Sequence, residues 1–417
     1  MLDRSAAPEV SFNPEINLLN YQTSILRNAI PVYSIADSRH EVVGIQFFFS
    51  GGKKLEASKG ASYFATHLLK SGTKTFNVNY INDFFEFRGA FVQIQSGLDY
   101  DSISLYCLSE KLEEVLPFFL VLVNESNFPE DQIDKLRKKK IQEININLQK
   151  SNYWANKLLK QSLFGTHAYG HLISIDDIEA LERANIQSFW NSALNNIGFV
   201  TITGKFDEEL VLKLLENFLK APKPRSIAAT KFKFEVSRQI KSLESSEQTS
   251  LKIGLPTIEL THSDYPALSL GNTIWGGYFG SRLMQTIREE KGLTYGIRSS
   301  FLHLQEVSYL QISADLKKGA GEETLSLIES ELNLLIQKSV SSDELNKVKS
   351  FIIGEYKSGT ESIFDKMSKI KFLKVHNLPD NYFVELYRKI LESNSENVAK
   401  AIEKYIVPQL FHVVIVE

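Results

Sequence analysis

The sequence predicts an α+β fold made of two similar halves, each an antiparallel-rich β-sheet packed with helices. The chain has 417 residues, enough for two or three domains of about 100–200 residues each. Strand-like and helix-like segments follow one another in the same order in both halves. Matching positions keep a nearly constant offset, since Leu345 follows Ile133 by 212 residues and Val413 follows Val200 by 213. We therefore expect a duplicated unit rather than a short-period repeat.

The first half is expected to open and close with strands. Residues 42–50 are rich in Val, Ile and Phe and stop at two glycines, which predicts a strand. Residues 60–70 carry apolar side chains at helical spacing. Residues 92–107 alternate like a strand or a hairpin that is interrupted near Gly97. Further elements are expected as helices from Ser109, over 129–148 and over 176–194, with a closing strand at 198–203.

The second half repeats this order. A strand is expected at 248–255, a helix at 265–275 and strands within 296–314. Later elements are a helix at 322–337, a helix opened by a capping-box pattern at 341–344, and a closing strand at 411–416. We place the first domain at 1–220, a linker at 221–235 and the second domain at 236–417. Two prolines near the start of the linker, Pro222 and Pro224, suit a stiff exposed connection.

Composition and charge exclude several classes of function. There are 47 Lys and Arg against 50 Asp and Glu, so nothing favours binding to nucleic acid or to a membrane surface. The only cysteine, Cys107, allows neither an intramolecular disulfide nor a cysteine-built zinc site. The first residues lack a signal-peptide pattern, and the apolar stretch at 115–123 is too short for a membrane helix. We expect a soluble cytoplasmic protein, or a periplasmic one if a leader has been removed.

One candidate site lies on the helix expected at 60–70. Tyr63 and His67 are four residues apart and therefore share a face, with Thr66 between them. Zinc-binding helices use this spacing for two histidines, but a phenol with an ordinary pKa near ~10 must first lose its proton. A threonine cannot act as a base near neutral pH. A single histidine on such a helix is more often a hydrogen-bonded packing residue.

A second pair of histidines and a cationic pair complete the candidates. His167 and His171 lie in a loop-like segment without a third ligand nearby in sequence, which disfavours a metal site. A helix should end near Lys291, with Gly292 after it, and the chain should then return toward a strand carrying Tyr295. The guanidinium of Arg288 and the phenol of Tyr295 are suitable donors to a peptide carbonyl or an oxyanion. The alternative is a salt bridge beside a packed tyrosine.

Two segments carry a family resemblance. Residues 282–296, which include Arg288 and Tyr295, resemble the C-terminal signature of the M16 family, the pitrilysin and insulysin type of inverted-zincin peptidases. Residues 60–73 fall where that family carries its zinc helix, and residues 165–170 give weaker support. The resemblance extends from about residue 32 to the C-terminus. Two homologous domains in one chain of this size resemble the M16B subtype, so the chain is expected to form half of a clam-shell.

The chain departs from the family at the metal site. Active members carry His-x-x-Glu-His, which supplies two zinc ligands and a general base. Tyr63, Thr66 and His67 stand at those positions, so the first ligand and the base are missing. Glu143 lies 76 residues after His67, which is the spacing of the family's third ligand. The resemblance therefore implies that the N-terminal domain is catalytically dead and that this chain binds no metal.

The resemblance also implies a division of labour. Arg288 and Tyr295 would hold the scissile carbonyl of a peptide and its tetrahedral intermediate in trans, while a partner M16 subunit with an intact His-x-x-Glu-His supplies the zinc and the base. The chain would then be the non-catalytic, substrate-binding subunit of a heterodimeric zinc peptidase. One alternative is a pure scaffold like the M16-related core subunits of respiratory complexes. The other is a self-sufficient hydrolase with a rearranged metal site built from His67, Glu143 and either His167 or His171.

Overall fold

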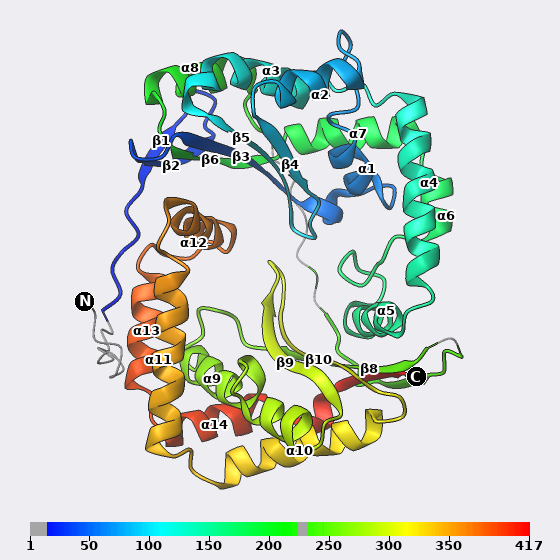
Figure 1. Ribbon diagram of the computed structural model, residues 1–417, viewed down its shortest axis with the longest axis vertical. Coiled ribbons are helices and arrows are strands. Elements are labelled where there is room, and N and C mark those ends of the chain that lie inside the picture. The colour runs from blue at the N-terminus through cyan, green and yellow to red at the C-terminus, as the bar shows by residue number, and fades with distance from the viewer. Residues whose placement is uncertain (1–14, 224–229, 231, 245) are drawn as a thin grey trace, which may run out of the picture.

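The computed structural model describes residues 15–223, 230, 232–244 and 246–417, which fold into two α+β units. Figure 1 shows the units facing each other across an open middle, each with its own sheet and helices. The first sheet has six strands and the second has five. The predicted fold class is confirmed. The first residues of the chain and most of residues 224–231 within the predicted linker lie outside the described residues.

The first sheet has the strand order β1-β2-β6-β3-β5-β4. Only β2 and β6 pair in parallel; the other neighbours are antiparallel. The strand expected at 42–50 is β3, and the expected hairpin is β4 and β5 with its break after Gln95. The strands are β1 Gln22–Ile25, β2 Pro31–Ala36, β3 Val42–Ser50, β4 Phe91–Gln95, β5 Tyr100–Leu108 and β6 Ile197–Gly204.

Helices cover this sheet and bury an aromatic core that includes Phe47, Phe64 and Trp190. The helix expected at 176–194 is two helices, because Ser174 and Glu182 each start a helix with a capping box. The helices are α1 Ala61–His67, α2 Val78–Glu86, α3 Leu112–Glu125, α4 Glu130–Asn147, α5 Ser151–Phe164, α6 Ile175–Glu179, α7 Arg183–Leu194 and α8 Glu208–Phe218.

The second sheet has the strand order β7-β11-β8-β10-β9. Its strands are β7 Arg238–Lys241, β8 Gln248–Thr257, β9 Thr294–His303, β10 Ser308–Lys317 and β11 His412–Val416. Its α-helices are α9 Tyr265–Asn272, α10 Gly321–Gln337, α11 Ser342–Ser358, α12 Ile363–Val375, α13 Tyr382–Glu392 and α14 Ser395–Tyr405. The helix expected at 265–275 ends as a π-helix, η3 Thr273–Gly277, and a second π-helix, η4 Met284–Glu290, precedes β9. Such π-turns are rare and often occur at functional sites.

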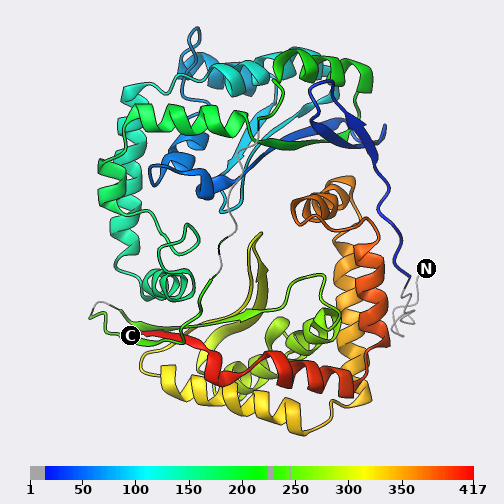
Figure 2. The ribbon, with the colours of Figure 1, turned by 180° about the vertical axis from the view of Figure 1, so that it is seen from behind.

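One helix of each unit packs on the sheet of the other unit. Helix α5 packs on β8 and β11, where Leu159 and Leu163 lie against Gly254. Helix α12 packs on β6 and β2, where Met367 and Ile370 cluster with Ile35. The first residues of α5 and α12 are 212 positions apart, the same offset that the sequence shows elsewhere. The exchange is visible from behind in Figure 2 and buries apolar surface that joins the two units.

A group of mostly buried polar side chains also joins the units, where the β9–β10 turn reaches the first unit. Lys54 Nζ lies 2.9 Å from Asp99 Oδ1, 3.0 Å from Gln305 Oε1 and 3.1 Å from Glu306 Oε1. The Tyr169 hydroxyl donates to Asp99, and only 5% of the Lys54 side chain is exposed. We call these five residues the junction cluster. Its single ammonium meets two carboxylates and one amide oxygen, so it fixes the turn against the first unit.

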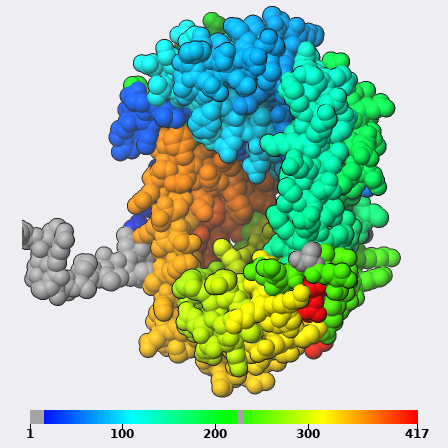
Figure 3. All heavy atoms as spheres, turned by 45° about the vertical axis from the view of Figure 1, so that its right-hand side comes forward, coloured from blue at the N-terminus to red at the C-terminus, as the bar shows by residue number. Residues whose placement is uncertain are grey.

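The space between the units is open to solvent. Figure 3 shows a hollow between the column of α11 and the column of α4, which we call the central hollow. Among the residues that the structure describes, no helix combines the length and the apolar character that crossing a bilayer requires.

Candidate functional site

The degenerate zinc position lies on the short helix α1. Gly60 precedes the helix with φ +91°, a backbone conformation that favours glycine. The Glu56 carboxylate accepts hydrogen bonds from the backbone N–H groups of Gly60 and Ser62 at 3.2 and 2.8 Å. Burial raises the pKa of Glu56 to about 7, although these hydrogen bonds act in the opposite direction. Phe64 and Ala65 are buried in the core, so the sequence pattern fixes which face of α1 remains accessible.

Tyr63, Thr66 and His67 are held by contacts within α1. The Tyr63 and His67 rings stack with centroids 3.9 Å apart, and His67 Nδ1 donates to the Tyr63 carbonyl oxygen at 2.7 Å. Thr66 is 2% exposed, and its hydroxyl donates to the Ser62 carbonyl oxygen at 2.8 Å. Burial and the charge of Glu143 raise the pKa of Tyr63, so its phenol stays protonated at neutral pH. This face therefore offers one imidazole nitrogen of His67, and a threonine stands at position 66 in place of the carboxylate that serves active members as the general base.

An ammonium group occupies the region where a third ligand would meet a metal. Lys140 Nζ lies 2.9 Å from Glu143 Oε1 and 4.4 Å from the centroid of the Tyr63 ring. Burial lowers the pKa of His67, and the charges of Lys140 and Lys139 add to that effect. A dication would have to displace Lys140 from Glu143 and lie close to a fixed positive charge. Within the described residues, no three His, Cys, Asp or Glu side chains are grouped so that they could hold a metal ion. The residues present do not fit a zinc ion.

The loop histidines have other partners. His171 Nε2 lies 2.9 Å from Asp177 Oδ2, and His167 Nε2 lies 3.9 Å from Glu306 of the junction cluster. Their segment is a series of turns, as expected, and it supports the contact between the units. Because no ligand group forms among the described residues, the alternative of a rearranged metal site built from His67, Glu143 and a loop histidine has no structural support.

Restoring a ligand should restore zinc binding only when Lys140 is also removed. Tyr63→His places an imidazole one helical turn before His67, and Lys140→Ala frees Glu143. We expect the double variant to bind zinc about 10-fold or more tighter than Tyr63→His alone, in a competition assay with a chromophoric chelator. Lys139→Ala combined with Tyr63→His is the matched control, since Lys139 is exposed. Equal affinities in the two double variants would show that Lys140 does not block the site.

Arg288 and Tyr295 are presented by the π-helix η4 and the strand β9. Lys291 ends η4 and Gly292 follows with φ +61°, which confirms the predicted helix end. The Arg288 guanidinium lies over the Phe279 ring, 4.6 Å from its centroid, and no carboxylate of the described residues pairs with it. Tyr295 is 94% exposed. The salt bridge and the packed tyrosine of the alternative interpretation are therefore not what the structure contains, and both side chains keep free donors.

The structure also identifies the sheet edges. Strands β1 and β4 are the edges of the first sheet, and β7 and β9 are the edges of the second. Each edge leaves a row of backbone N–H and C=O groups that can pair with an extended peptide. Strand β4 belongs to the segment at 92–107 that the sequence predicts to be extended, and nothing in the sequence marks β4 or β9 as an edge strand.

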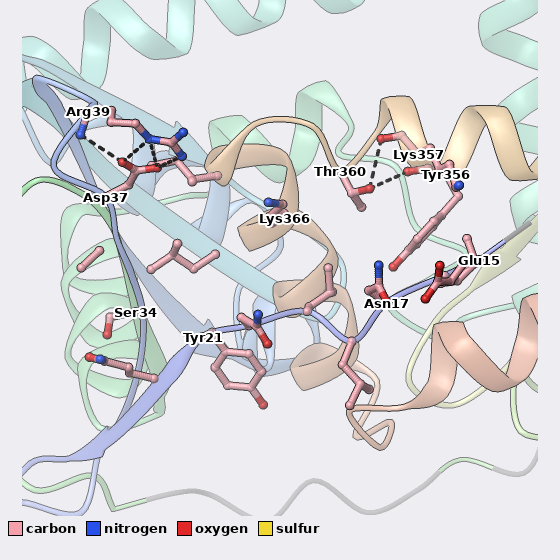
Figure 4. A pocket seen from close by; sticks show the side chains of 18 residues that line it. Glu15, Asn17, Tyr21, Ser34, Asp37, Arg39, Tyr356, Lys357, Thr360 and Lys366 are labelled. Atoms are coloured by element: carbon pink, nitrogen blue, oxygen red, sulfur yellow. Dashed lines mark hydrogen bonds and ion pairs between the residues drawn. The ribbon is translucent and has the colours of Figure 1, made fainter. Parts of the chain in front are cut away.

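A pocket of about 650 Å³ lies outside these candidates. Figure 4 shows it between the segment before β1, the end of β2, and helices α11 and α12, with Tyr21 and Lys366 on its wall. Its Arg39 and Asp37 side chains are hydrogen-bonded to each other at 2.9 Å. None of Tyr63, His67, Arg288 or Tyr295 lines it. No pattern in the sequence predicted this pocket, because its walls come from segments more than 300 residues apart.

The fold and the site define an inverted-zincin type of chain without a complete metal site of its own. The insulinase model of peptidase family M16 matches residues 32–174, and the model of the peptidase M16 inactive domain matches residues 182–351. Together these matches span most of the chain. The chain belongs to peptidase family M16.

Several relatives share most of their length with this chain. An uncharacterized zinc protease, YmxG, of Bacillus subtilis is 22% identical over 346 residues, which cover 82% of this chain and 81% of that protein. A non-peptidase homolog, also called YmxG, of Helicobacter pylori is 24% identical over 376 residues, covering 85% and 84%. A peptidase M16 inactive domain from Pseudomonas fluorescens has a TM-score of 0.86 with 26% identity and covers 95% of this chain and 98% of its own. A protease from Helicobacter pylori shares the fold with a TM-score of 0.85, 17% identity and coverage of 96% and 100%.

Proposed function

We propose that this chain is the non-catalytic, substrate-binding subunit of a two-chain M16 zinc peptidase that acts on peptides. The partner subunit supplies the zinc ion and the general base from an intact His-x-x-Glu-His. This chain supplies Arg288 and Tyr295, which donate hydrogen bonds to the scissile carbonyl oxygen and stabilise the charge that develops on it.

One observation carries the proposal. Lys140 blocks the face of α1 where active members bind zinc, whereas the side chains of Arg288 and Tyr295 keep free hydrogen-bond donors. Lys140 forms an ion pair with Glu143 beside the Tyr63 ring, so Glu143 is not available to bind a zinc ion. Without a bound zinc ion, this chain cannot activate water by itself. Tyr295 is almost fully exposed, and Arg288 has no carboxylate partner among the described residues. The packing of the fold does not explain why Tyr295 is exposed and Arg288 is unpaired, whereas a role in binding a peptide does. The match to the M16 inactive domain over 182–351 includes both residues, and one relative bears the name non-peptidase homolog.

Reconstitution tests the proposal. The chain is co-expressed with an M16 chain of the same genome that carries an intact His-x-x-Glu-His, and cleavage of a fluorogenic peptide library is measured. We expect cleavage by the pair, loss of that activity on chelation, and no cleavage by either chain alone. A stable pair without any gain in cleavage would favour the scaffold alternative. Chelator-sensitive cleavage by this chain alone would overturn the proposal.

A further inference from the structure

A second pocket, of about 340 Å³, lies beside the strand that carries Tyr295. Its walls come from α9, β9, α11, α12 and α13, elements that Figure 1 places around the open middle. Most of its large side chains are aromatic or aliphatic: Tyr265, Phe301, Phe372, Tyr382, Phe383 and Leu386. Their rings contact one another, with centroids of Tyr265 and Phe301 5.8 Å apart and those of Phe372 and Phe383 5.9 Å apart. The wall is therefore preformed, and it combines aromatic rings with polar groups.

The buried polar groups in this wall already have partners. The Tyr265 hydroxyl lies 2.9 Å from His303 Nε2, and His303 Nδ1 lies 2.8 Å from the Ser308 hydroxyl. The Tyr382 hydroxyl donates to the Leu260 carbonyl oxygen at 3.3 Å. A ligand that enters the pocket thus meets aromatic rings beside polar groups that are already hydrogen-bonded, so an apolar side chain can lie against the rings without competing for those hydrogen bonds.

Unlike these polar groups, the Arg298 side chain has no partner among the described residues. Its side chain is exposed, and the described residues offer it no carboxylate within ion-pair distance. Side chains alternate along β9, so Arg298 and Ser300 lie on the face opposite Ser299 and Phe301. Residues of both faces line the pocket, which therefore wraps around the free edge of β9. An exposed guanidinium among the lining residues complements a carboxylate.

We propose that this pocket binds a large apolar side chain of a peptide, with the aromatic wall taking the side chain and Arg298 pairing with an adjacent carboxylate. The inference rests on the proposed function and names its substrate class: peptides in which an aromatic or large aliphatic residue adjoins an acidic residue or the C-terminal carboxyl group. An apolar side chain supplies the burial, and the charged pair fixes the direction of the peptide along the mouth.

Three small probes separate the contributions in the full-length chain by ligand-observed NMR titration. N-acetylphenylalanine carries the ring and the carboxylate, its amide lacks the charge, and N-acetylglycine lacks the ring. We expect N-acetylphenylalanine to bind with a dissociation constant on the order of 1 mM, the affinity typical of a ligand of this size. The amide should bind about 5- to 10-fold more weakly, and N-acetylglycine should not bind measurably.

Variants assign the binding to this pocket. Arg298→Gln should bring the acid and the amide to equal affinity, and Ser300→Trp should fill the mouth and weaken both about 10-fold or more. Lys318→Gln, an exposed change of charge outside the pocket, should bind like the parent chain. Unaltered binding in both pocket variants, or equal binding of the acid and the amide to the parent chain, would overturn the inference.

The test does not depend on a partner subunit. If the reconstituted pair cleaves peptides but the probes do not bind, the pocket assignment is wrong and the proposed function stands. If the probes bind as expected but no partner yields a peptidase, the proposed function is wrong and the pocket remains a binding site of the isolated chain.

Discussion

Lys54→Met is expected to lower the free energy of unfolding by about 3–5 kcal/mol, because it leaves buried carboxylates without their cation. In the parent chain, the Lys54 ammonium lies within 3.1 Å of both Asp99 and Glu306. Burial alone would raise the pKa of Glu306, but hydrogen bonds from the Thr230 N–H and from Lys54 more than offset it, so the pKa is lowered. Urea unfolding monitored by circular dichroism gives the change in free energy, and X-ray scattering shows whether the units separate.

Two further variants distinguish the junction cluster from a general surface effect. Lys59→Met changes an exposed lysine of the same segment and should alter stability by no more than about 0.5 kcal/mol. Lys54→Met combined with Glu306→Gln removes the cation together with one of its carboxylates, so it should be less destabilised than the sum of the single variants. Strict additivity of the two changes would argue against direct coupling between these side chains.

The sequence predicted the repeated architecture well because the strands and helices of each half follow from patterns of a few neighbouring residues. The strand β3 follows from a short run of Val, Ile and Phe, and the end of η4 at Gly292 follows from the conformational freedom of glycine; both patterns extend over only a few residues. The exchange of α5 and α12 between the sheets could not be predicted in this way. A helix with an apolar face buries that face against a sheet or another helix. The sequence of residues 151–164 does not indicate against which of the two sheets this helix packs.

The candidate site was predictable in part for the same reason. The absence of a ligand at Tyr63 and of a base at Thr66 is visible in the sequence alone. The position of Lys140 is not, although Lys140 and Glu143 have the three-residue spacing of a helical ion pair. Lys140 belongs to another helix, α4, and its ammonium lies over the Tyr63 ring of α1. Likewise, Arg298 became a candidate only when α9, β9 and α13 were brought together around one pocket.

Arg288→Ala is expected to lower kcat of the reconstituted peptidase about 10²–10³-fold, with a smaller effect on KM. A donor that meets the oxyanion stabilises the transition state more than the bound peptide, so its loss appears mainly in kcat. Tyr295→Phe removes one hydroxyl and should cost about 10-fold or more by the same argument. Stopped assays under saturating peptide measure kcat, and size-exclusion chromatography verifies that each variant still assembles with its partner.

Matched controls make the comparison specific to the donor pair. Arg27→Ala removes a guanidinium that is 91% exposed and pairs with Glu216 at the surface, and Tyr80→Phe removes the hydroxyl of another exposed tyrosine. Both controls should keep kcat within about 2-fold of the parent value, since surface pairs contribute little. If kcat is unchanged in both Arg288→Ala and Tyr295→Phe, the partner subunit supplies all the groups that act on the peptide. The free donors of this chain would then have no catalytic role, whatever the affinity between the subunits.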